Sequence, residues 1–453
     1  GHCSTNHYSR IPPISPSPIS VYSYAPIQAR AMDRSDIRNF RKWHRQAALR
    51  SKQAGFDIVY VYAAHSGTLL THFLSRRINR RTDEYGGSLE NRVRLFRELI
   101  EDTKDAVGDS CAVAVRFCVE EFLGAQGITS ENEGKEIVEM LAELPDLWDV
   151  NISDWSMDSA TSRFESEGYQ EPYMAFVKSM TSKPVVGVGR FTSPDTMLSL
   201  IQRGVMDMIG AARPSIADPF LPKKIEEGRE DEIRECIGCN ICVMSDELSV
   251  PISCTQNPTM GEEWRRGWHP ERIEPRNSDD GVLVVGGGPA GLECALALGQ
   301  RGYRVILAEA SAELGGRVSR ESRLPGLAEW GRVRDYRVLM LERLANVTIY
   351  RENPLSADEI FEFSAEDQFD YSHVMLANGS SWRRNGLGRI HREPIPGLDK
   401  LKVFTPDDIM AGVIVKGRVV VFDDDHFYMG GVLAEKLRRE GHDVLLATPA
   451  PDI

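Results

Sequence analysis

The first half of the chain alternates regularly between amphipathic helical segments and short apolar runs. Each apolar run is short enough to be a strand buried on both faces. No two apolar runs follow one another directly, so the strands are predicted to be parallel and joined by right-handed crossovers. The predicted strands are 56–62, 112–117, 148–152, 184–188 and 206–211, and the predicted helices are 36–54, 89–107, 131–144, 171–180 and 194–203.

The polar or glycine-containing ends of these strands are typical of a (β/α)₈ barrel. A barrel would need three further strands. Residues 1–30 are rich in Pro, Ser and Tyr and are predicted to be loop, so residues 1–35 cannot supply them all. From the pattern alone, an incomplete barrel and an open parallel sheet both remain possible.

Composition narrows the choice of partners and compartment. A formal charge of -13 disfavours nucleic acid and anionic membranes, because both are polyanions. The sequence contains neither the roughly 18 consecutive apolar residues of a membrane span nor the pattern of a secretory signal. A chain of 453 residues predicts two or three domains. Closely spaced cysteines in such a chain favour metal ligands in a reducing compartment, so a cytoplasmic location is expected.

Half of the eight cysteines lie in one segment of nineteen positions, as Cys236, Cys239, Cys242 and Cys254. The pattern CxxCxxC with a fourth thiol after eleven further residues suits a [4Fe–4S] cluster, because a tight loop and one distant return bring four thiolates together. A zinc site is the alternative, although zinc is more often held by two CxxC pairs. We therefore expect an iron–sulfur cluster here.

A dinucleotide fingerprint follows the cysteine segment. The apolar run 282–285 leads into Gly286-Gly-Gly288-Pro-Ala-Gly291 and a helix, and the next strand ends at Glu309. The glycines let a pyrophosphate approach the helix N-terminus, and the acid would bind the ribose hydroxyls. An ordinary tight turn is the alternative. The pattern predicts binding of ADP or FAD.

A second strand, turn and helix begin near residue 418, but Asp423-Asp-Asp425 stands where glycines would be expected. Three carboxylates repel a pyrophosphate, and side chains in place of glycine keep it away from the backbone. This turn is therefore predicted not to bind NAD(P)H.

Several motifs together resemble one known family. Tyr62-Ala-Ala-His65 and Arg81-Thr-Asp-Glu-Tyr-Gly-Gly-Ser-Leu-Glu-Asn-Arg92 resemble the loop after the fourth strand of the old yellow enzyme barrel. The likeness continues through Gly187-Val-Gly-Arg190, Gly210-Ala-Ala-Arg213 and the cysteine segment into the fingerprint. In this order the chain resembles the FMN- and iron–sulfur-containing flavoproteins with an ADP-binding domain, and among them the trimethylamine, dimethylamine and histamine dehydrogenase group.

The resemblance implies a catalytic trio of Tyr62, His65 and Asp158 beside the substrate nitrogen. It places Trp155 in the aromatic bowl that holds the alkylammonium group, where a cation over an indole face gains about 0.5–2 kcal/mol. Tyr62 and Trp155 could instead be aromatic residues packed at the barrel rim. The shorter cysteine spacing also resembles the amine dehydrogenases more than the dienoyl-CoA reductases.

Cofactor residues follow from the same resemblance. Arg116 would lie near N1 and the C2 carbonyl of FMN, where a positive charge stabilises the reduced flavin. The phosphate would bind in the loops after the last two strands. Arginines paired with surface acids are the alternative. The implied FMN residues are Arg116, Gly189, Arg190, Ala212 and Arg213. The implied ADP or FAD residues are Gly286, Gly288, Gly291, Glu309 and Arg317. Arg317 lies in a Leu-Gly-Gly-Arg segment that resembles glutathione reductase-type flavoproteins.

These features predict oxidation of a small amine at FMN, with electrons passing through the cluster to an electron-transfer flavoprotein. An NAD(P)H-dependent enoate or 2,4-dienoyl-CoA reductase is the alternative, as is an inactive cluster- and ADP-binding fragment. The resemblance implies a homodimer and a chain that begins and ends within a longer protein. The expected domains are a partial FMN-binding barrel (1–222), a cluster segment (223–277), a Rossmann-like ADP or FAD domain (278–400) and an incomplete second nucleotide fold (401–453).

Overall fold

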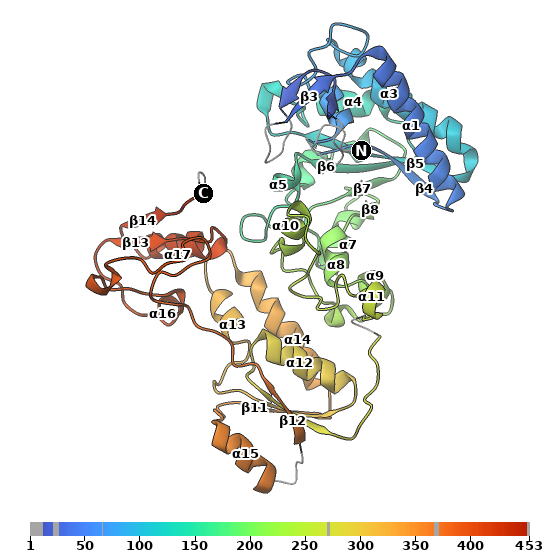
Figure 1. Ribbon diagram of the computed structural model, residues 1–453. Coiled ribbons are helices and arrows are strands. Elements are labelled where there is room, and N and C mark those ends of the chain that lie inside the picture. Colours follow the sequence, from blue (N-terminus) through green and yellow to red (C-terminus); the bar gives the residue numbers. More distant parts are fainter. Residues whose placement is uncertain (1–11, 21–26, 66, 270–271, 367–370, 451–453) are drawn as a thin grey trace. The chain divides into compact units, whose positions relative to one another are not determined.

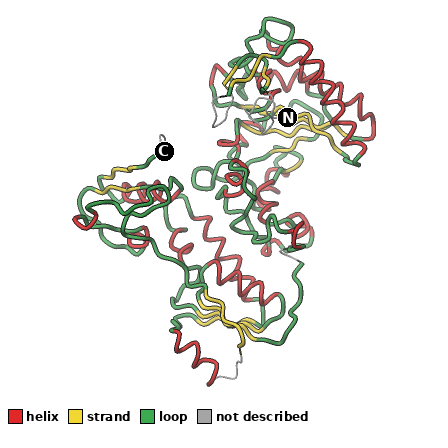
Figure 2. Tube along the Cα trace, in the orientation of Figure 1, coloured by secondary structure: helices red, strands yellow, loops and turns green. Residues whose placement is uncertain are grey.

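The computed structural model describes residues 12–20, 27–65, 67–269, 272–366 and 371–450 (Figure 1). The chain divides into two compact units. The first contains Gly1–Thr161 and Glu165–Ser215, and the second contains Ser162–Phe164 and Ile216–Ile453. Helices, strands and loops are distinguished in Figure 2.

The first unit is built on a five-stranded parallel sheet of order β4-β5-β6-β7-β8. Residues Tyr62, Arg116 and Asp149 are paired in register across its first three strands. The strands are β4 (Ile58–Ala63), β5 (Ala112–Glu120), β6 (Leu147–Ile152), β7 (Val185–Gly187) and β8 (Met208–Ile209). All overlap the predicted runs, and the prediction of parallel α/β sheets is confirmed. The barrel itself stays a prediction.

Helices cover this sheet and begin where their capping residues predict. Asp33 and Asp36 form a capping box at the start of α1, and the Ser88 side chain accepts from Asn91 N at the start of α3. Phe96 of α3 and Trp148 of β6 both pack against Phe117 within the buried core. The helices of this unit are α1 (Arg34–Gln53), α2 (Leu69–Leu74), α3 (Leu89–Val107), α4 (Glu133–Leu141), α5 (Trp155–Asp158), α6 (Glu171–Met174) and α7 (Pro194–Gln202), followed by α8 (Ala212–Ala217).

Two predictions about this unit are wrong. Residues 1–30 were predicted to be loop, but their described part forms a small sheet of order β1-β3-β2 from β1 (Ile14–Ser15), β2 (Ile19–Ser20) and β3 (Gln28–Ala31). Strands this short have no detectable period. The helix predicted at 171–180 ends at Met174 and is followed by a 3₁₀ turn, Val177–Ser179. There the Ser179 hydroxyl donates to Phe176 O and competes with the helical pattern.

The second unit contains a four-stranded parallel sheet of order β11-β10-β9-β12. Its strands are β9 (Gly281–Val285), β10 (Arg304–Ala308), β11 (Val347–Tyr350) and β12 (Tyr371–Leu376). Buried Val284, Leu296 and Leu307 belong to one apolar core with Tyr336. The helices are α12 (Pro289–Gln300), α13 (Arg317–Glu321), α14 (Arg332–Glu342) and α15 (Ala357–Glu366).

The rest of the second unit is less regular. The cysteine segment lies among the short helices α9 (Leu221–Glu226), α10 (Ile241–Glu247) and α11 (Glu263–Arg266). Near the C-terminus, α16 (Pro406–Met410) precedes a parallel pair of strands, β13 (Val419–Phe422) and β14 (Val444–Ala447), joined by α17 (Tyr428–Arg439). Within the described residues, no helix has both the length and the apolar character required to cross a membrane.

Candidate active site

The carboxyl ends of the first sheet carry unusual backbone conformations. Single non-glycine residues with positive φ follow four successive strands: His65 (55°) after β4, Phe122 (56°) after β5, Ser153 (45°) after β6 and Arg190 (60°) after β7. Such conformations cost of order 1–3 kcal/mol each and are retained where the surroundings require them, often at functional sites. In parallel α/β proteins this edge of the sheet is also where ligands bind.

Three of the predicted residues meet in one hydrogen-bonded chain at this edge. The Tyr62 hydroxyl contacts Nδ1 of His65, and Nε2 of His65 lies 2.9 Å from Oδ2 of Asp158. His65 and Asp158 side chains are only 9% and 10% exposed. Since an ionised carboxylate can only accept, the His65 Nε2 that faces it is a donor. When Nε2 carries the only ring proton, Nδ1 accepts from the Tyr62 hydroxyl. The chain thus runs from Tyr62 to Asp158.

Asp158 stays ionised despite its burial. Burial by itself would raise the pKa of this carboxyl, but the hydrogen bond and charge interaction with His65, the Gln170 amide and the charge of Arg116 outweigh it and lower the pKa. The Gln170 amide donates to Oδ1 at 2.9 Å, so each carboxylate oxygen has a donor. Burial raises the pKa of Tyr62 to about 12, with Arg116 opposing the shift. Tyr62 is therefore a neutral phenol at physiological pH.

A second carboxylate faces the same guanidinium. Arg116 Nη1 lies 3.6 Å from Oδ2 of Asp149, and Nη2 lies 3.9 Å from Oδ2 of Asp158. Burial raises the pKa of Asp149 to about 6, with Arg116 opposing the shift. In the described residues, Arg116 Nε and Asp149 Oδ1 are buried and have no hydrogen-bond partner. Buried polar atoms of this kind fit a bound ligand with its own donors and acceptors.

The remaining predicted FMN residues lie at the ends of the last strands. Gly189 accepts a hydrogen bond from Gly168 N at 2.8 Å, and Arg190 is almost fully buried. Ala212 is the first residue of α8. Arg213 Nη1 donates to the carbonyls of Ser159 and Ala160 at 3.2 and 3.0 Å. Arg213 is thus joined to the loop that follows Asp158.

Trp155 is the residue predicted to form a wall of the substrate site, and its side chain lies outside the described parts of the structure. Trp155 begins α5, the short helix that ends at Asp158. The backbone therefore places Trp155 within one helical turn of Asp158. Its role in the aromatic bowl stays a prediction.

The glycine turn of the second unit has the geometry expected for a phosphate site. Gly286 has φ 107°, and a Cβ on Gly291 would lie 1.8 Å from Gly286 O. A Cβ on Gly288 would meet nothing within 4 Å, so this position opens to solvent. Gly288 is also the N-cap of α12 and has no side chain to satisfy the first N–H groups of that helix. Those groups are suited to an anion.

The acid at the end of β10 lies against this turn. Glu309 Oε2 accepts from Gly287 N at 2.6 Å, and Oε1 accepts from the Ser311 hydroxyl at 2.6 Å. Arg317 is placed differently: its Nη2 donates to Ser380 O, and its guanidinium stands over the Trp382 ring at 5.7 Å. The structure therefore brings Glu309 to the glycines and engages Arg317 with the loop after β12.

The four clustered thiols share the second unit, but the structure does not gather them around one centre. Among the described side chains, no group of three or more His, Cys, Asp or Glu residues is arranged to hold a metal ion. Gly238 N donates to Cys236 Sγ and Gln256 N donates to Cys254 Sγ, both at 3.4 Å. Burial raises the pKa of the Cys254 thiol, and the Asn257 and Gln256 N–H groups oppose the shift. The iron–sulfur cluster therefore stays a prediction from the spacing of the four cysteines.

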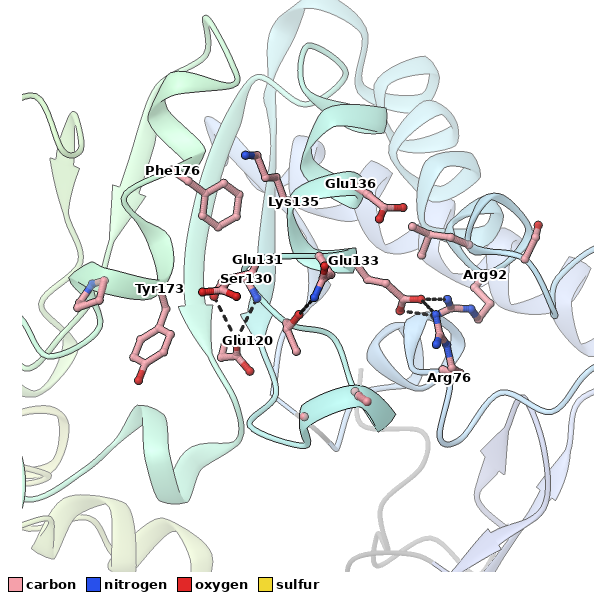
Figure 3. Close-up of a pocket in the computed structure, with 18 of the residues that line it drawn as sticks. Arg76, Arg92, Glu120, Ser130, Glu131, Glu133, Lys135, Glu136, Tyr173 and Phe176 are labelled. Carbon is pink, nitrogen blue, oxygen red and sulfur yellow. Dashed lines mark hydrogen bonds and ion pairs between the residues drawn. The ribbon is translucent and has the colours of Figure 1, made fainter.

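A cavity of about 1390 Å³ in the first unit contains none of the predicted site residues. Figure 3 shows Glu133 bound by two arginines and Glu120 bound by Ser130. Glu133 is held by Arg76 and Arg92, with Arg92 Nη1 at 3.0 Å from Oε2, and Glu120 accepts from Ser130 N at 2.9 Å. The cavity's size alone therefore does not identify it as the reaction site.

Comparison with known proteins identifies the family. The NADH:flavin oxidoreductase / NADH oxidase family matches residues 7–232, and the NAD(P)-binding Rossmann-like domain matches residues 284–341. Over the first of these ranges the chain belongs to the NADH:flavin oxidoreductase / NADH oxidase family. This agrees with the parallel sheets of the two units.

The relatives include amine dehydrogenases. The chain is 43% identical to dimethylamine dehydrogenase of Hyphomicrobium sp. (strain x), over 92% of this chain and 57% of that protein. A solved structure of 6-hydroxypseudooxynicotine amine oxidase from Pseudomonas geniculata N1 is similar, with 56% identity and a TM-score of 0.93 over 98% of this chain and 66% of that one. Histamine dehydrogenase from Rhizobium sp. 4-9 is also similar, with 51% identity and a TM-score of 0.92 over 98% of this chain and 64% of that one. The resemblance to amine dehydrogenases is confirmed. The chain spans about three fifths to two thirds of these relatives' length.

Two residues of the site were not predicted from the sequence. Gln170 lies in a loop twelve residues after Asp158, and no pattern marks it. Asp149 could have been found, because a carboxylate inside the buried strand Leu147–Ile152 is unusual. Both contribute to the charge balance of the site.

Proposed function

We propose that this protein takes part in the FMN-dependent oxidation of a small amine, by dealkylation or deamination. The observation that carries the proposal is the buried chain from Tyr62 through His65 to Asp158. This arrangement can take a proton from an alkylammonium ion, and only the neutral amine has the lone pair that supports its oxidation. The similarity to dimethylamine and histamine dehydrogenases supports the same chemistry.

Tyr62 acts as a proton relay in this proposal. Its hydroxyl hydrogen points to His65 Nδ1, so its oxygen can accept an N–H of the substrate. As the substrate proton reaches the oxygen, the hydroxyl proton passes to Nδ1. The imidazolium that results is stabilised by Asp158. A tyrosinate base is disfavoured, because burial raises the pKa of Tyr62 to about 12.

Arg116 and the phosphate-loop residues would hold FMN. When bound, FMN supplies the acceptor for the hydride equivalent that leaves the neutral amine. The unpartnered Nε of Arg116 and the strained loop at Arg190 fit a cofactor at this edge of the sheet. We include Gly189, Ala212 and Arg213 in this site.

The second unit would carry electrons away and hold a nucleotide. Cys236, Cys239, Cys242 and Cys254 would hold a [4Fe–4S] cluster, and an electron-transfer flavoprotein would be the acceptor. The turn Gly286–Gly291 with Glu309 would hold ADP or FAD in a structural role. In this proposal the intact protein is a homodimer.

The alternative is an NAD(P)H-dependent enoate or dienoyl-CoA reductase. It is favoured by the 29% identity to cinnamate reductase of Clostridium sporogenes. The acidic turn argues against NAD(P)H binding at the second nucleotide fold. There Asp424 accepts from Ile390 N and His391 N, both at 2.7 Å, so its carboxylate already occupies the backbone donors of the neighbouring loop.

Anaerobic reduction of the FMN-loaded protein distinguishes these functions. Dimethylamine, trimethylamine and histamine are mixed in turn with the protein, and NADPH is mixed in a parallel experiment. We expect an amine to bleach the flavin absorbance and NADPH to leave it unchanged. Bleaching by NADPH alone would favour the reductase, and brown protein without a flavin band would favour the inactive fragment.

A further inference from the structure

The helix that carries Asp158 is too short to be stable by itself. α5 (Trp155–Asp158) has four residues. A single helical turn is marginal in water, because forming it fixes several dihedral angles for one hydrogen bond. Within the turn, the N–H groups of Met157 and Asp158 both donate to Asp154 O, at 3.3 and 2.8 Å. The position of the Asp158 carboxylate therefore depends on the groups that contact α5 from outside.

Tyr169 contacts the C-terminal end of this helix. Its hydroxyl donates to Met157 O at 2.6 Å and to Asp158 O at 2.5 Å, in a three-centre hydrogen bond. Burial raises the pKa of Tyr169, so the hydroxyl keeps its proton at neutral pH and remains a donor. The last carbonyls of a helix have no partner inside it, and Tyr169 satisfies two of them.

Gln170 holds the carboxylate of Asp158. Gln170 is fully buried, and its Nε2 donates to Asp158 Oδ1 at 2.9 Å. The same Nε2 lies 3.2 Å from Asp158 O and 3.0 Å from the Tyr169 hydroxyl oxygen. A carboxylate and a carbonyl can only accept, so the amide nitrogen of Gln170, and not its oxygen, must face them. Oδ2 of Asp158 then faces His65 Nε2 at 2.9 Å.

The backbone just before Tyr169 is fixed to the loop that follows β7. Gly168 N donates to Gly189 O at 2.8 Å, and Ser193 N donates to Glu167 Oε2 at 3.2 Å. Gly168 has φ 79°, and a Cβ on Gly189 would lie 3.3 Å from Gly168 Cα, so the two backbones pass closely. The two side chains that hold α5 therefore extend from a backbone that is anchored outside α5.

We propose that Tyr169 and Gln170 are positioning residues for amine oxidation, which hold the Asp158 carboxylate in line with His65. The inference rests on the part of the proposed function that assigns proton transfer to the chain from Tyr62 to Asp158. Neither positioning residue touches the reacting atoms in this role. They fix the direction of Oδ2, because a hydrogen bond weakens steeply when its geometry departs from linearity. A carboxylate fixed in this way stabilises the imidazolium that proton transfer produces.

Amide hydrogen exchange of the purified full chain tests the positioning directly. Tyr169→Phe removes only the hydroxyl, and Gln170→Leu removes the amide at similar volume. The peptide that covers residues 154–161 should exchange about tenfold faster in each variant, because α5 opens more easily without these donors. Tyr173→Phe is the matched control, because it loses a hydroxyl four residues further along, where the ring packs edge-on against Phe122 at 5.0 Å. Its exchange should stay within about twofold of the parent.

Stopped-flow measurement of flavin reduction tests the consequence for the reaction. The probe is whichever of dimethylamine, trimethylamine and histamine bleaches the FMN of the parent. Gln170→Leu should lower the limiting rate about tenfold. The half-saturating amine concentration should stay within about twofold, because Gln170 does not touch the amine in this role. Tyr169→Phe should lower the limiting rate about threefold, and Tyr173→Phe should leave it unchanged.

The pH profile separates positioning from a loss of folded protein. Burial already raises the pKa of Asp158, and without the Gln170 amide fewer hydrogen bonds oppose it. The acidic limb of the rate should therefore move to higher pH by about one unit in Gln170→Leu. Partial unfolding would lower the rate at every pH without moving the limb. The other titratable or charged groups that face Asp158 stay in place in this variant, and they are Tyr62, His65, Arg116, Cys118, Asp149 and Tyr169.

Parental exchange in both Tyr169→Phe and Gln170→Leu would overturn the positioning role. Faster exchange with a parental rate and pH profile would also overturn the inference, because the two residues would then support the fold alone. If Gln170→Leu does not fold, Tyr169→Phe decides by its exchange and its rate. If none of the three amines bleaches the parent, the proposed function is overturned, and this inference with it.

Discussion

The two parallel sheets use their carboxyl edges in different ways. After β4 to β7 of the first unit, non-glycine residues such as His65 and Arg190 hold positive φ angles and project polar side chains. After β9 of the second unit, the turn is made of Gly286, Gly287 and Gly288 and leads into the N-terminus of α12. Both sheets are parallel, yet one edge carries side chains and the other is nearly free of them.

The difference follows from what each edge would bind. Proton transfer requires groups whose pKa values the protein can adjust, and only side chains provide them. Phosphate binding requires close approach to N–H groups, which side chains obstruct. The first edge therefore accepts backbone strain to position its residues, whereas the second uses glycine to avoid strain. Each of the following variants tests one side of this contrast.

The largest effect is expected from Asp158→Asn at the side-chain edge. The amide can still accept from His65 but no longer stabilises an imidazolium, so amine-dependent flavin reduction should slow by about 10²–10⁴-fold. Stopped-flow absorbance measures the rate, and urea unfolding verifies that stability is retained. A parental rate would remove Asp158 from the proposed proton path.

Gly291→Ala should have the next largest effect, on stability. The added Cβ would lie 1.8 Å from Gly286 O, and relieving such a clash costs about 3 kcal/mol or more. Gly288→Ala is the matched control, because its Cβ meets nothing within 4 Å. We expect Gly288→Ala to unfold like the parent but to lose ADP binding in calorimetry. Equal stability of the two variants would contradict the packing described here.

Asp149→Asn tests the cost of a buried carboxyl at the side-chain edge. In the folded protein the pKa of Asp149 is raised to about 6. Between about pH 4 and pH 6, the folded protein therefore keeps a proton on this carboxyl, whereas the unfolded chain has lost it. Ionising this carboxyl in the folded protein lowers the free energy of unfolding. This loss is absent below about pH 4 and complete above about pH 6. We therefore expect the variant to be more stable than the parent by about 1–3 kcal/mol at pH 8.

Urea unfolding at pH 4 and pH 8 measures this difference. The gain should nearly vanish at pH 4, where the parent carboxyl is protonated in both states. A gain that does not change with pH would show that packing, not ionisation, is responsible.

The smallest effect is expected at Ser153, where φ is 45°. Ser153→Gly and Ser153→Ala both lose the hydroxyl, but only glycine adopts this conformation without strain. The glycine variant should be more stable than the alanine variant by about 1 kcal/mol. Thermal unfolding of the pair isolates the backbone contribution. A more stable alanine variant would show that the edge is not strained at this position.

The sequence predicted the sheets better than the connections between them. Runs such as 112–117 were found because a buried parallel strand is continuously apolar, and Leu89–Val107 was predicted with the bounds it has in the structure. The two-residue strands β1 and β2 were missed because two residues show no period. The break after Met174 depends on a local side-chain bond that periodicity does not reveal.

The site was predictable where its residues are close in sequence. Tyr62 and His65 lie three positions apart at a strand end, and Glu309 ends the strand after the glycine turn. Asp158 lies 93 positions from His65, and only the family resemblance linked them. Gln170 depends on the path of a long loop and could not be inferred.

The two glycines of the nucleotide turn have a consequence for how this fold can change over evolutionary time. Gly291 supports the fold, whereas Gly288 stands open to the solvent. A lineage could therefore lose the proposed nucleotide site by one substitution at Gly288 and keep an intact domain. The turn Asp423–Asp425, between the parallel strands β13 and β14, lacks glycine and still joins two paired strands.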